Sequence, residues 1–259
     1  MAVPGQVTDL SRIEAATTPY PDHHGHQVEG YLARPRGVDH APGLIVIHEA
    51  FGLNEHIRDL ARRFANAGFA ALAVNLYADV GTPDASNMND VMAKMFSLRD
   101  EDVVRHLESA INWLKGGPVA APKVGVIGFC SGGRQTLLVA CKSTAVDAAC
   151  DCWGGFITRA TPDRETTPER PVPVIDLVEG LQCPLFAVFG AEDQNPSPQD
   201  ADRLQDALIR HGKAATIKIF ADAGHAFLAD YRPSYREKAA FELWPQLIQF
   251  FQRHLTPND

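Results

Sequence analysis

A cysteine at the centre of a Gly-x-Cys-x-Gly segment, Gly128-Phe-Cys-Ser-Gly132, is the residue with the clearest capacity for chemistry. An apolar run at 124–127 precedes the segment, and a helical pattern at 134–140 follows it. In such a strand–turn–helix elbow, the positions two before and two after the nucleophile must be small so that strand and helix can approach. The helix N-terminus favours thiolate over thiol and offers N–H groups to an oxyanion. The spacing therefore predicts that Cys130 is a nucleophile for acyl transfer.

Ser131 is a rival nucleophile, but the position two before it is Phe129, which is too bulky for the elbow. The register therefore favours Cys130. Taken alone, Gly-x-Cys-x-Gly is a weak signal, and a buried inert cysteine is the ordinary alternative. The strand before the segment, the helix after it and the consecutive glycines favour the nucleophile.

Acyl transfer on such a framework needs an acid and then a histidine downstream of the nucleophile. Of the three downstream histidines, His211 ends a helix and His254 lies near the C-terminus, whereas His225 follows the apolar run at 216–220. We expect His225 to be the base, with a structural histidine as the alternative. The run at 185–189 leads into Glu192 and Asp193, and we prefer Asp193 as the acid that orients the histidine. Helix capping or solvation in a loop is the alternative role for Asp193.

The loop after the first buried run, His48-Glu-Ala-Phe-Gly-Leu-Asn54, occupies the place that normally supplies a second oxyanion donor. The backbone N–H groups of Ala50 and Ser131 are therefore the candidate oxyanion hole. Glu49 places a carboxylate at the end of a buried strand, where it should be paired or functional. A salt-bridged loop acid and a functional group are equally compatible with the spacing.

Short apolar runs alternate with amphipathic segments, which predicts a doubly wound, mostly parallel α/β sheet flanked by helices, the α/β-hydrolase fold. The predicted strands are Leu44–Ile47, Phe69–Val74, Val124–Ile127, Leu185–Phe189 and Thr216–Phe220. Four helices are predicted. The first begins at an Asn54 cap and ends at Gly68, and the second contains Val103 to Leu114 and stops at Gly116-Gly-Pro118. The third follows Pro196-Ser-Pro198, and the last covers Ser234–Leu255. Pro245 should kink the last helix or split it in two.

The organisation predicts a single domain over residues 1–259, a length that is ordinary for one α/β domain. An antiparallel edge strand or hairpin is expected over 20–34, a flexible N-terminal segment over 1–19, and a surface excursion at the sheet edge over 158–173, with its four prolines and many charges.

The chain has 24 basic and 32 acidic residues, a net charge of −8, which argues against nucleic acid or an anionic membrane as a partner. No apolar run is long enough to span a membrane, and the N-terminus lacks the pattern of a secretory signal. Five cysteines, an odd number, favour a reducing cytoplasm over a disulfide framework. Cys150 and Cys152 lack further zinc ligands at workable spacing. We expect no metal or cofactor, and a monomer or small homo-oligomer.

Four ordered motifs resemble the dienelactone hydrolase family from about residue 20 to 253: His48-Glu-Ala-Phe-Gly-Leu-Asn, Gly-Phe-Cys-Ser-Gly-Gly, Phe-Gly-Ala-Glu-Asp-Gln and Ala-Gly-His-Ala-Phe. The resemblance implies hydrolysis of an ester or of a cyclic enol-lactone, carboxymethylenebutenolide, through a thioester intermediate. It also implies that Glu49 holds the resting thiol and takes its proton when substrate enters.

The sequence departs from the family pattern at Ala229, where the resemblance would place an arginine that binds the substrate carboxylate. Arg232 or Arg99 could substitute for it. A different esterase, a thioesterase or an acyl-transfer enzyme acting on a non-carboxylated substrate fits the triad equally well. A non-catalytic ligand-binding or redox-sensing relative is a further alternative, against which the complete triad counts.

Overall fold

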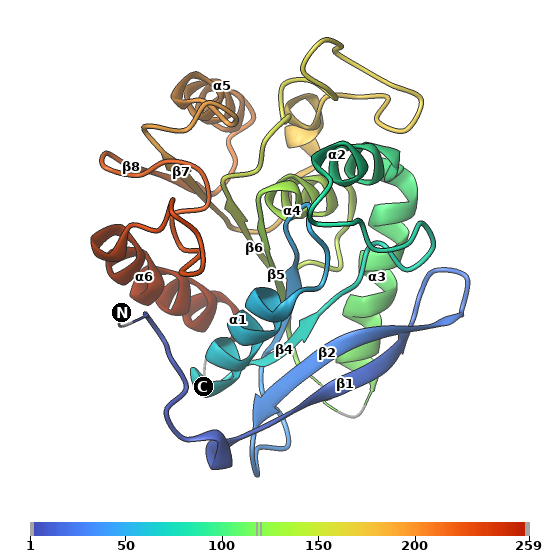
Figure 1. Cartoon of the computed structure of the whole chain (residues 1–259), viewed down its shortest axis with the longest axis vertical. Helices are drawn as coiled ribbons and strands as arrows, with labels where there is room; N and C mark the ends of the chain where they lie inside the picture. The colour runs from blue at the N-terminus through green and yellow to red at the C-terminus, as the bar shows by residue number, and fades with distance from the viewer. Residues whose placement is uncertain (1–2, 118, 120, 257–259) are drawn as a thin grey trace.

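The computed structural model describes residues 3–117, 119 and 121–256 (Figure 1). Over these residues one eight-stranded sheet forms, in the order β1-β2-β4-β3-β5-β6-β7-β8. The strands from β4 to β8 in this order pair in parallel, whereas β2 is antiparallel to both β1 and β4. The strand bounds are Ile13–Pro21 (β1), Gln27–Pro35 (β2), Gly43–Ile47 (β3), Ala70–Ala73 (β4), Val124–Phe129 (β5), Ala148–Cys152 (β6), Leu185–Gly190 (β7) and Ala215–Phe220 (β8).

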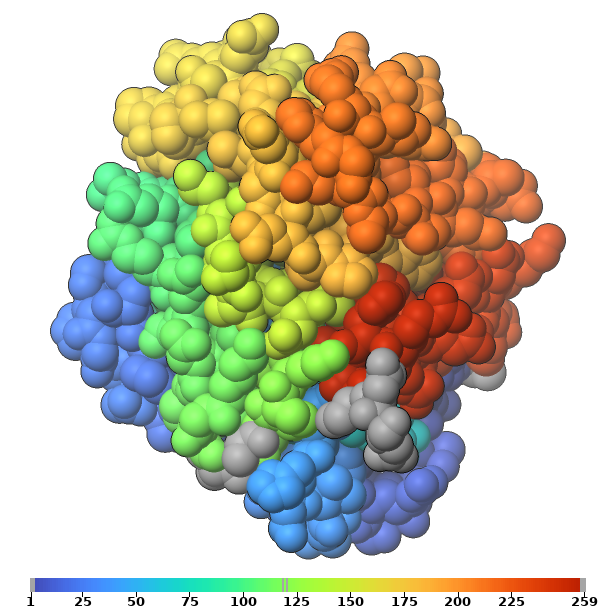
Figure 2. Space-filling view, turned by 180° about the vertical axis from the view of Figure 1, so that it is seen from behind, coloured from blue at the N-terminus to red at the C-terminus, as the bar shows by residue number. Residues whose placement is uncertain are grey.

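Helices cover both faces of the sheet (Figure 1). Their bounds are Glu55–Asn66 (α1), Met88–Ser97 (α2), Asp100–Gly116 (α3), Ser131–Lys142 (α4), Pro198–Arg210 (α5) and Glu237–Leu255 (α6), with 3₁₀ turns at Leu10–Arg12 and Val174–Gly180. Leu44 and Val46 of β3 pack in one apolar cluster with α1 and α6, while Ile45 and Ile47 pack in another with α3, α4 and α5. Seen from behind, α3 (green) and α5 (orange) lie at the surface of the molecule (Figure 2).

This architecture confirms the predicted fold class, and β3, β4, β5 and β7 are buried because side chains on both faces of an inner strand contact helices. The run expected at 216–220 is instead the edge strand β8, in which only Phe220 is buried. Asn54 caps α1 as predicted, since its side chain accepts a hydrogen bond of 3.1 Å from the Ile57 N–H. The helix α3 ends at Gly116 as predicted, although Pro118 lies outside the described residues. Strand β6 and helix α2 were not predicted.

Two expectations about the chain ends hold only in part over the described residues. The segment expected to be flexible contains a 3₁₀ turn and most of β1, which pairs along its whole length with β2; Met1 and Ala2 lie outside the described residues. The expected hairpin is therefore present but begins at Ile13. Of the two effects expected of Pro245, a kink or a split, the split is excluded, since helix α6 runs unbroken from Glu237 to Leu255.

The excursion at 158–173 connects β6 to β7, which are inner strands, and so does not lie at the sheet edge. Residues 162–166 are exposed, whereas Arg170 is buried. Within the described part of the chain, no helix combines the length and apolar character that crossing a membrane requires. Because β3, β5, β7 and β8 are parallel, the loops at their carboxyl ends meet at one edge of the sheet, where open α/β sheets place ligands.

Candidate active site

Cys130 stands in a sharp turn between β5 and α4, with a φ of +57°. A Cβ added at Gly128 would lie 2.0 Å from the carbonyl oxygen of Gly132. One added at Gly132 would lie 2.6 Å from the carbonyl oxygens of Ile47 and His48. Both contacts are far inside van der Waals distance. The steric reason given for the two glycines in the sequence is therefore confirmed: side chains there would force β5, α4 and the β3 loop apart.

The structure brings His225 and Asp193 together with Cys130, from loops after β8, β7 and β5. His225 Nδ1 donates to Asp193 Oδ2 at 2.8 Å, and the imidazole lines the same cavity as Cys130. Burial by itself lowers the pKa of His225, but the proximity of Cys130 and the hydrogen bond and charge of Asp193 raise it to about 10. Asp193 is 4% exposed, so its charge acts on the imidazole with little screening by water.

The other four cysteines are buried, whereas Cys130 is partly exposed. Burial raises the pKa values of Cys141 and Cys183 to about 12. Burial also raises the pKa of Cys152, whose sulfur lies 3.8 Å from that of Cys150. The thiols of Cys141, Cys152 and Cys183 therefore remain protonated at neutral pH. Cys130 is the only one of the five cysteines, all of which lie in the described part of the chain, that is not buried.

His48 and Tyr77 fix the backbone around Ala50. His48 Nε2 accepts from the Leu76 N–H at 3.2 Å, so its hydrogen is on Nδ1, which donates to the Glu49 carbonyl at 2.6 Å. Burial lowers the pKa of His48 to about 4, which keeps this tautomer neutral. Tyr77 Oη donates to the Ala50 carbonyl at 3.0 Å. The carbonyls on both sides of the Ala50 N–H are thus held in place.

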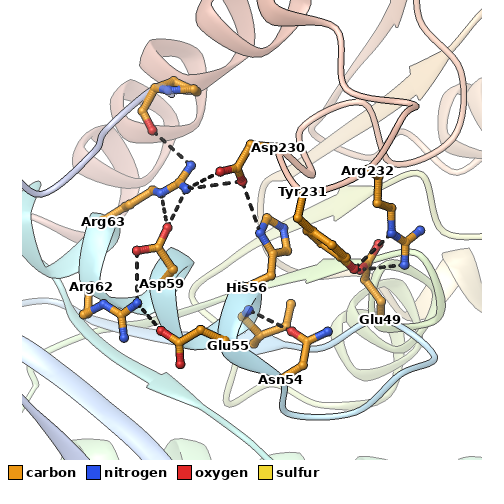
Figure 3. A network of polar contacts seen from close by, with 12 residues as sticks. Glu49, Asn54, Glu55, His56, Asp59, Arg62, Arg63, Asp230, Tyr231 and Arg232 are labelled. Carbon is orange, nitrogen blue, oxygen red and sulfur yellow. Dashed lines mark hydrogen bonds and ion pairs between the residues drawn. The ribbon is translucent and has the colours of Figure 1, made fainter. Parts of the chain in front are cut away.

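Glu49 is 1% exposed, and its carboxylate pairs with residues of the β8–α6 loop (Figure 3). Its Oε2 accepts from Tyr231 Oη at 3.0 Å and from the Arg232 guanidinium at 3.1 Å. Arg232 also stacks over Phe51 at 4.8 Å. In this state the carboxylate is occupied by Arg232 and Tyr231, which matches the salt-bridged alternative considered for Glu49.

The β8–α6 loop, which carries His225, is tied to α1 through Asp230 (Figure 3). Asp230 lies 3.3 Å from the Arg63 guanidinium and 3.4 Å from His56 Nδ1. The His56 ring packs against Tyr231, with the ring centroids 5.0 Å apart. Ion pairs to α1 and to Glu49 therefore hold both ends of the segment between Asp230 and Arg232.

A cavity of about 270 Å³ opens at Cys130 and His225. Ala50 and Ser131 line it, as does the predicted substrate-binding residue Arg232. Arg99 does not reach it: its side chain is 60% exposed, lies near Asp102 and borders a separate cavity with His23 and His106.

Two further arginines, Arg134 and Arg170, line the cavity and were not singled out in the sequence. Arg134 lies one helical turn after Cys130, a spacing that could have revealed it. Arg170 comes from the excursion between β6 and β7, and no local pattern places it near a residue 40 positions earlier. Both are 1% exposed.

The arginines of the cavity already have partners. Arg134 forms a bidentate pair with Asp100, at 2.7 and 3.0 Å. Arg170 donates to the Met95 carbonyl at the end of α2, and its guanidinium lies over the Phe96 ring at 5.0 Å. Burial and the charge of Arg134 lower the pKa of Arg170 to about 9, so it is still a cation at neutral pH. Arg232 is paired with Glu49, as described above.

Within the described residues, no group of three or more His, Cys, Asp or Glu side chains is placed to hold a metal ion. The cavity's titratable groups are instead a thiol, an imidazole and guanidiniums, which suit nucleophilic chemistry on a carbonyl.

The chain matches the model of the dienelactone hydrolase family over residues 28–255. It is 33% identical over 250 residues to a "putative carboxymethylenebutenolidase" of Methylorubrum extorquens, covering 95% of this chain and 84% of that protein. A protein of the same name from Escherichia coli K12 is 32% identical over 89% of this chain and 84% of its own length.

The crystal structure of a "putative dienelactone hydrolase" from Klebsiella pneumoniae superposes with a TM-score of 0.84 at 32% identity, covering 93% of this chain and 99% of that one. The family match spans the strands and loops that carry Cys130, Asp193 and His225. The chain therefore belongs to the dienelactone hydrolase family of carboxylic-ester hydrolases.

Proposed function

We propose that the chain hydrolyses a carboxylic ester or lactone through Cys130, with a thioester intermediate. One observation carries the proposal: His225 and Cys130 line the same cavity, and the buried Asp193 carboxylate accepts a hydrogen bond of 2.8 Å from the His225 imidazole. A thiol linked to an imidazole that a buried carboxylate orients is an activated nucleophile.

In the first half of the reaction, the Cys130 thiolate attacks the carbonyl carbon and forms a tetrahedral adduct with a negatively charged oxygen. The C–O bond to the leaving group then breaks, and protonated His225 gives its proton to the departing alkoxide. In the second half, neutral His225 takes a proton from water, and the hydroxide attacks the thioester. The C–S bond breaks, which releases the acid and returns the thiolate to its imidazolium partner.

The oxyanion of each tetrahedral adduct would accept from the N–H groups of Ala50 and Ser131. Both residues line the cavity, and Ser131 is the first residue of α4, where N–H groups lack partners within the helix. Each donor should contribute roughly 3 kcal/mol to stabilising the transition state.

Glu49 would act as a proton acceptor for the resting thiol only after its pair with Arg232 opens. An anionic group on a substrate could draw Arg232 away and free the carboxylate for this role. The pairing in the structure thus makes the proposed role of Glu49 conditional on what enters the cavity. An anionic substrate analogue should raise the rate of Cys130 alkylation in wild type. It should not raise that rate in Glu49→Gln, because the amide cannot take the thiol proton.

A second candidate substrate class, neutral esters or thioesters, is favoured by a specific observation. Ala229 stands where the family resemblance would place a carboxylate-binding arginine, and the three arginines that line the cavity have partners. A panel of p-nitrophenyl esters, thioesters and carboxylated lactones separates the two classes by kcat/KM.

The decisive experiment measures p-nitrophenyl acetate hydrolysis by wild type, Cys130→Ala and His225→Ala. Both variants should lose at least about a thousandfold in kcat/KM, because the nucleophile or its base is gone. Cys183→Ala is the matched control, since that thiol is buried away from the cavity. Wild-type turnover in both site variants would refute the triad.

Alkylation gives independent evidence on the thiol. Iodoacetamide should block activity with one equivalent bound at Cys130, located by peptide mass spectrometry. Modification spread over the five cysteines would contradict a selectively activated Cys130.

A further inference from the structure

Three methionines project from one face of α2 into the cavity at Cys130. The chain has four methionines; apart from Met1, they are Met88, Met92 and Met95. Their spacing of i, i+4 and i+7 places them on one side of the helix, and all three line the cavity. Concentrating every internal methionine on one short helix at the reactive cysteine calls for a functional explanation.

This face belongs to a small apolar cluster that is separate from the two main cores. Its buried members are Ala50, Val91 and Met95, against which Phe51, Met92, Phe96 and Phe156 pack. Val91 is fully buried and holds the helix in place, whereas Met92 is partly exposed and Met88 is 55% exposed. The outer methionines therefore expose apolar surface, and both of them line the cavity.

The position of α2 is fixed from both ends. Asn87 caps its start, accepting hydrogen bonds from the N–H groups of Asn89 and Asp90. Arg170 donates to the Met95 carbonyl near its end. The methionine side chains can change rotamer on this fixed helix, and flexible thioethers adapt to ligands of different shape.

We propose that this methionine face is a specificity wall that binds an apolar alkyl or aryl arm of the ester, next to the carbonyl attacked by Cys130. The proposal rests on the proposed function and narrows its substrate class to esters with an apolar arm. Two of the three arginines that line the cavity support this choice, because Arg134 and Arg232 are neutralised by Asp100 and Glu49. The third, Arg170, donates to the Met95 carbonyl and lies over the Phe96 ring, on the α2 side of the cavity.

The first test compares kcat/KM for p-nitrophenyl acetate, butyrate and hexanoate, and for methyl and butyl acetates. Two added methylenes that become buried should raise kcat/KM about tenfold in at least one of the two series. Met92→Gln keeps the side-chain length but adds polarity, and should remove most of that gain. Met92→Leu should restore it.

Met88→Gln provides a second variant whose result cannot come from misfolding, because Met88 is largely exposed. Like Met92→Gln, it should reduce the rise in kcat/KM that the longer esters give. Ile209→Gln on α5 is the matched control: Ile209 is 68% exposed, does not line the cavity, and should leave the preference unchanged. The proposal would be overturned if kcat/KM did not change with chain length in either ester series. It would also be overturned if the preference for longer esters persisted in both Met92→Gln and Met88→Gln.

A binding experiment separates this proposal from the proposed function. Cys130→Ala protein cannot form the thioester, so calorimetric titration with intact p-nitrophenyl esters reports binding alone. Affinity that rises with acyl or alkyl length, and falls on adding Met92→Gln, supports the wall even if wild type hydrolyses none of the esters. Equal affinity for short and long esters refutes the wall even if the triad is correct.

Discussion

At the scale of single residues, His48 is the side chain whose contacts say most about the proposed chemistry. Its Nδ1–H holds the Glu49 carbonyl, and that carbonyl shares a peptide unit with the Ala50 N–H. The orientation of the proposed oxyanion donor therefore depends on a neutral imidazole. The Glu49 side chain, from the same residue, instead contacts Arg232 and Tyr231.

We expect His48→Leu to lower kcat about tenfold or more with little change in KM, because the Ala50 N–H loses its orientation mainly toward the transition state. His48→Asn should recover much of the loss, since its amide can donate to the same carbonyl. Steady-state kinetics with p-nitrophenyl acetate measures both effects.

His211→Leu is the control for this substitution, because His211 is exposed at the end of α5. An equal loss in His48→Leu and His48→Asn, accompanied by a fall in melting temperature, would assign His48 a purely structural role.

At the scale of elements, α3 and α4 are joined by the pair between Asp100 and Arg134. Asp100 is the first residue of α3, its side chain is 11% exposed, and the Arg134 side chain is 2% exposed. Arg134 lies in the first turns of α4 and lines the cavity. The pair therefore fixes how the helix that starts at the nucleophile sits against its neighbour.

Asp100→Ala should lower the free energy of unfolding by about 3–5 kcal/mol, because it leaves a buried guanidinium without its carboxylate. Urea denaturation gives this value. Glu101→Ala is the matched control: Glu101 pairs with Arg105 on the exposed face of the same helix, and its loss should cost below about 1 kcal/mol. Equal destabilisation by the two substitutions would show that Arg134 relaxes into solvent.

At the scale of the whole molecule, a carboxyl group buried in β6 should contribute to the pH dependence of stability. Asp151 in β6 is fully buried; its Oδ1 accepts from the Gly154 N–H at 2.8 Å, and its Oδ2 has no hydrogen-bond partner within the described residues. Burial raises its pKa to about 7, although the Gly154 N–H acts in the opposite direction.

Between about pH 4 and pH 7 the folded protein holds a proton on Asp151 that the unfolded chain has released. The contribution of this group to stability is therefore complete at low pH and is lost as the pH rises through about 7. Asp151→Asn, which keeps an oxygen for Gly154, should be more stable than wild type at pH 8, by on the order of a few kcal/mol. The difference should shrink toward pH 4.

Thermal unfolding at pH 4.5, 6 and 8 tests this expectation. Asp202→Asn, at an exposed position of α5, serves as the control and should show no pH-dependent difference from wild type. A constant offset between Asp151→Asn and wild type across this range would mean that Asp151 is ionised in the folded protein.

The sequence by itself determined the features whose cause is local. Apolar runs predicted the inner strands, because side chains on both faces of a parallel strand must be apolar. The glycines at 128 and 132 predicted the elbow. At Gly128 the cause is local, because a side chain there would meet the Gly132 carbonyl; at Gly132 it is tertiary, because a side chain would meet the carbonyls of Ile47 and His48. Chain order then placed Asp193 and His225 at the same edge as Cys130, since parallel strands end together.

Only the tertiary structure decided what surrounds the cysteine. Strand β6 was not predicted because its Ala-Ala-Cys-Asp-Cys sequence carries a carboxylate that the fold buries. The start of the N-terminal hairpin was placed too late because β1 is a half-exposed edge strand. Arg170 reaches the cavity, Arg99 does not, and Glu49 pairs with Arg232, 183 positions away. These outcomes depend on which distant segments share one enclosed space, and on the cost of leaving a charge there without a partner. The spacing of residues along the chain does not show which charged groups will pair in that space.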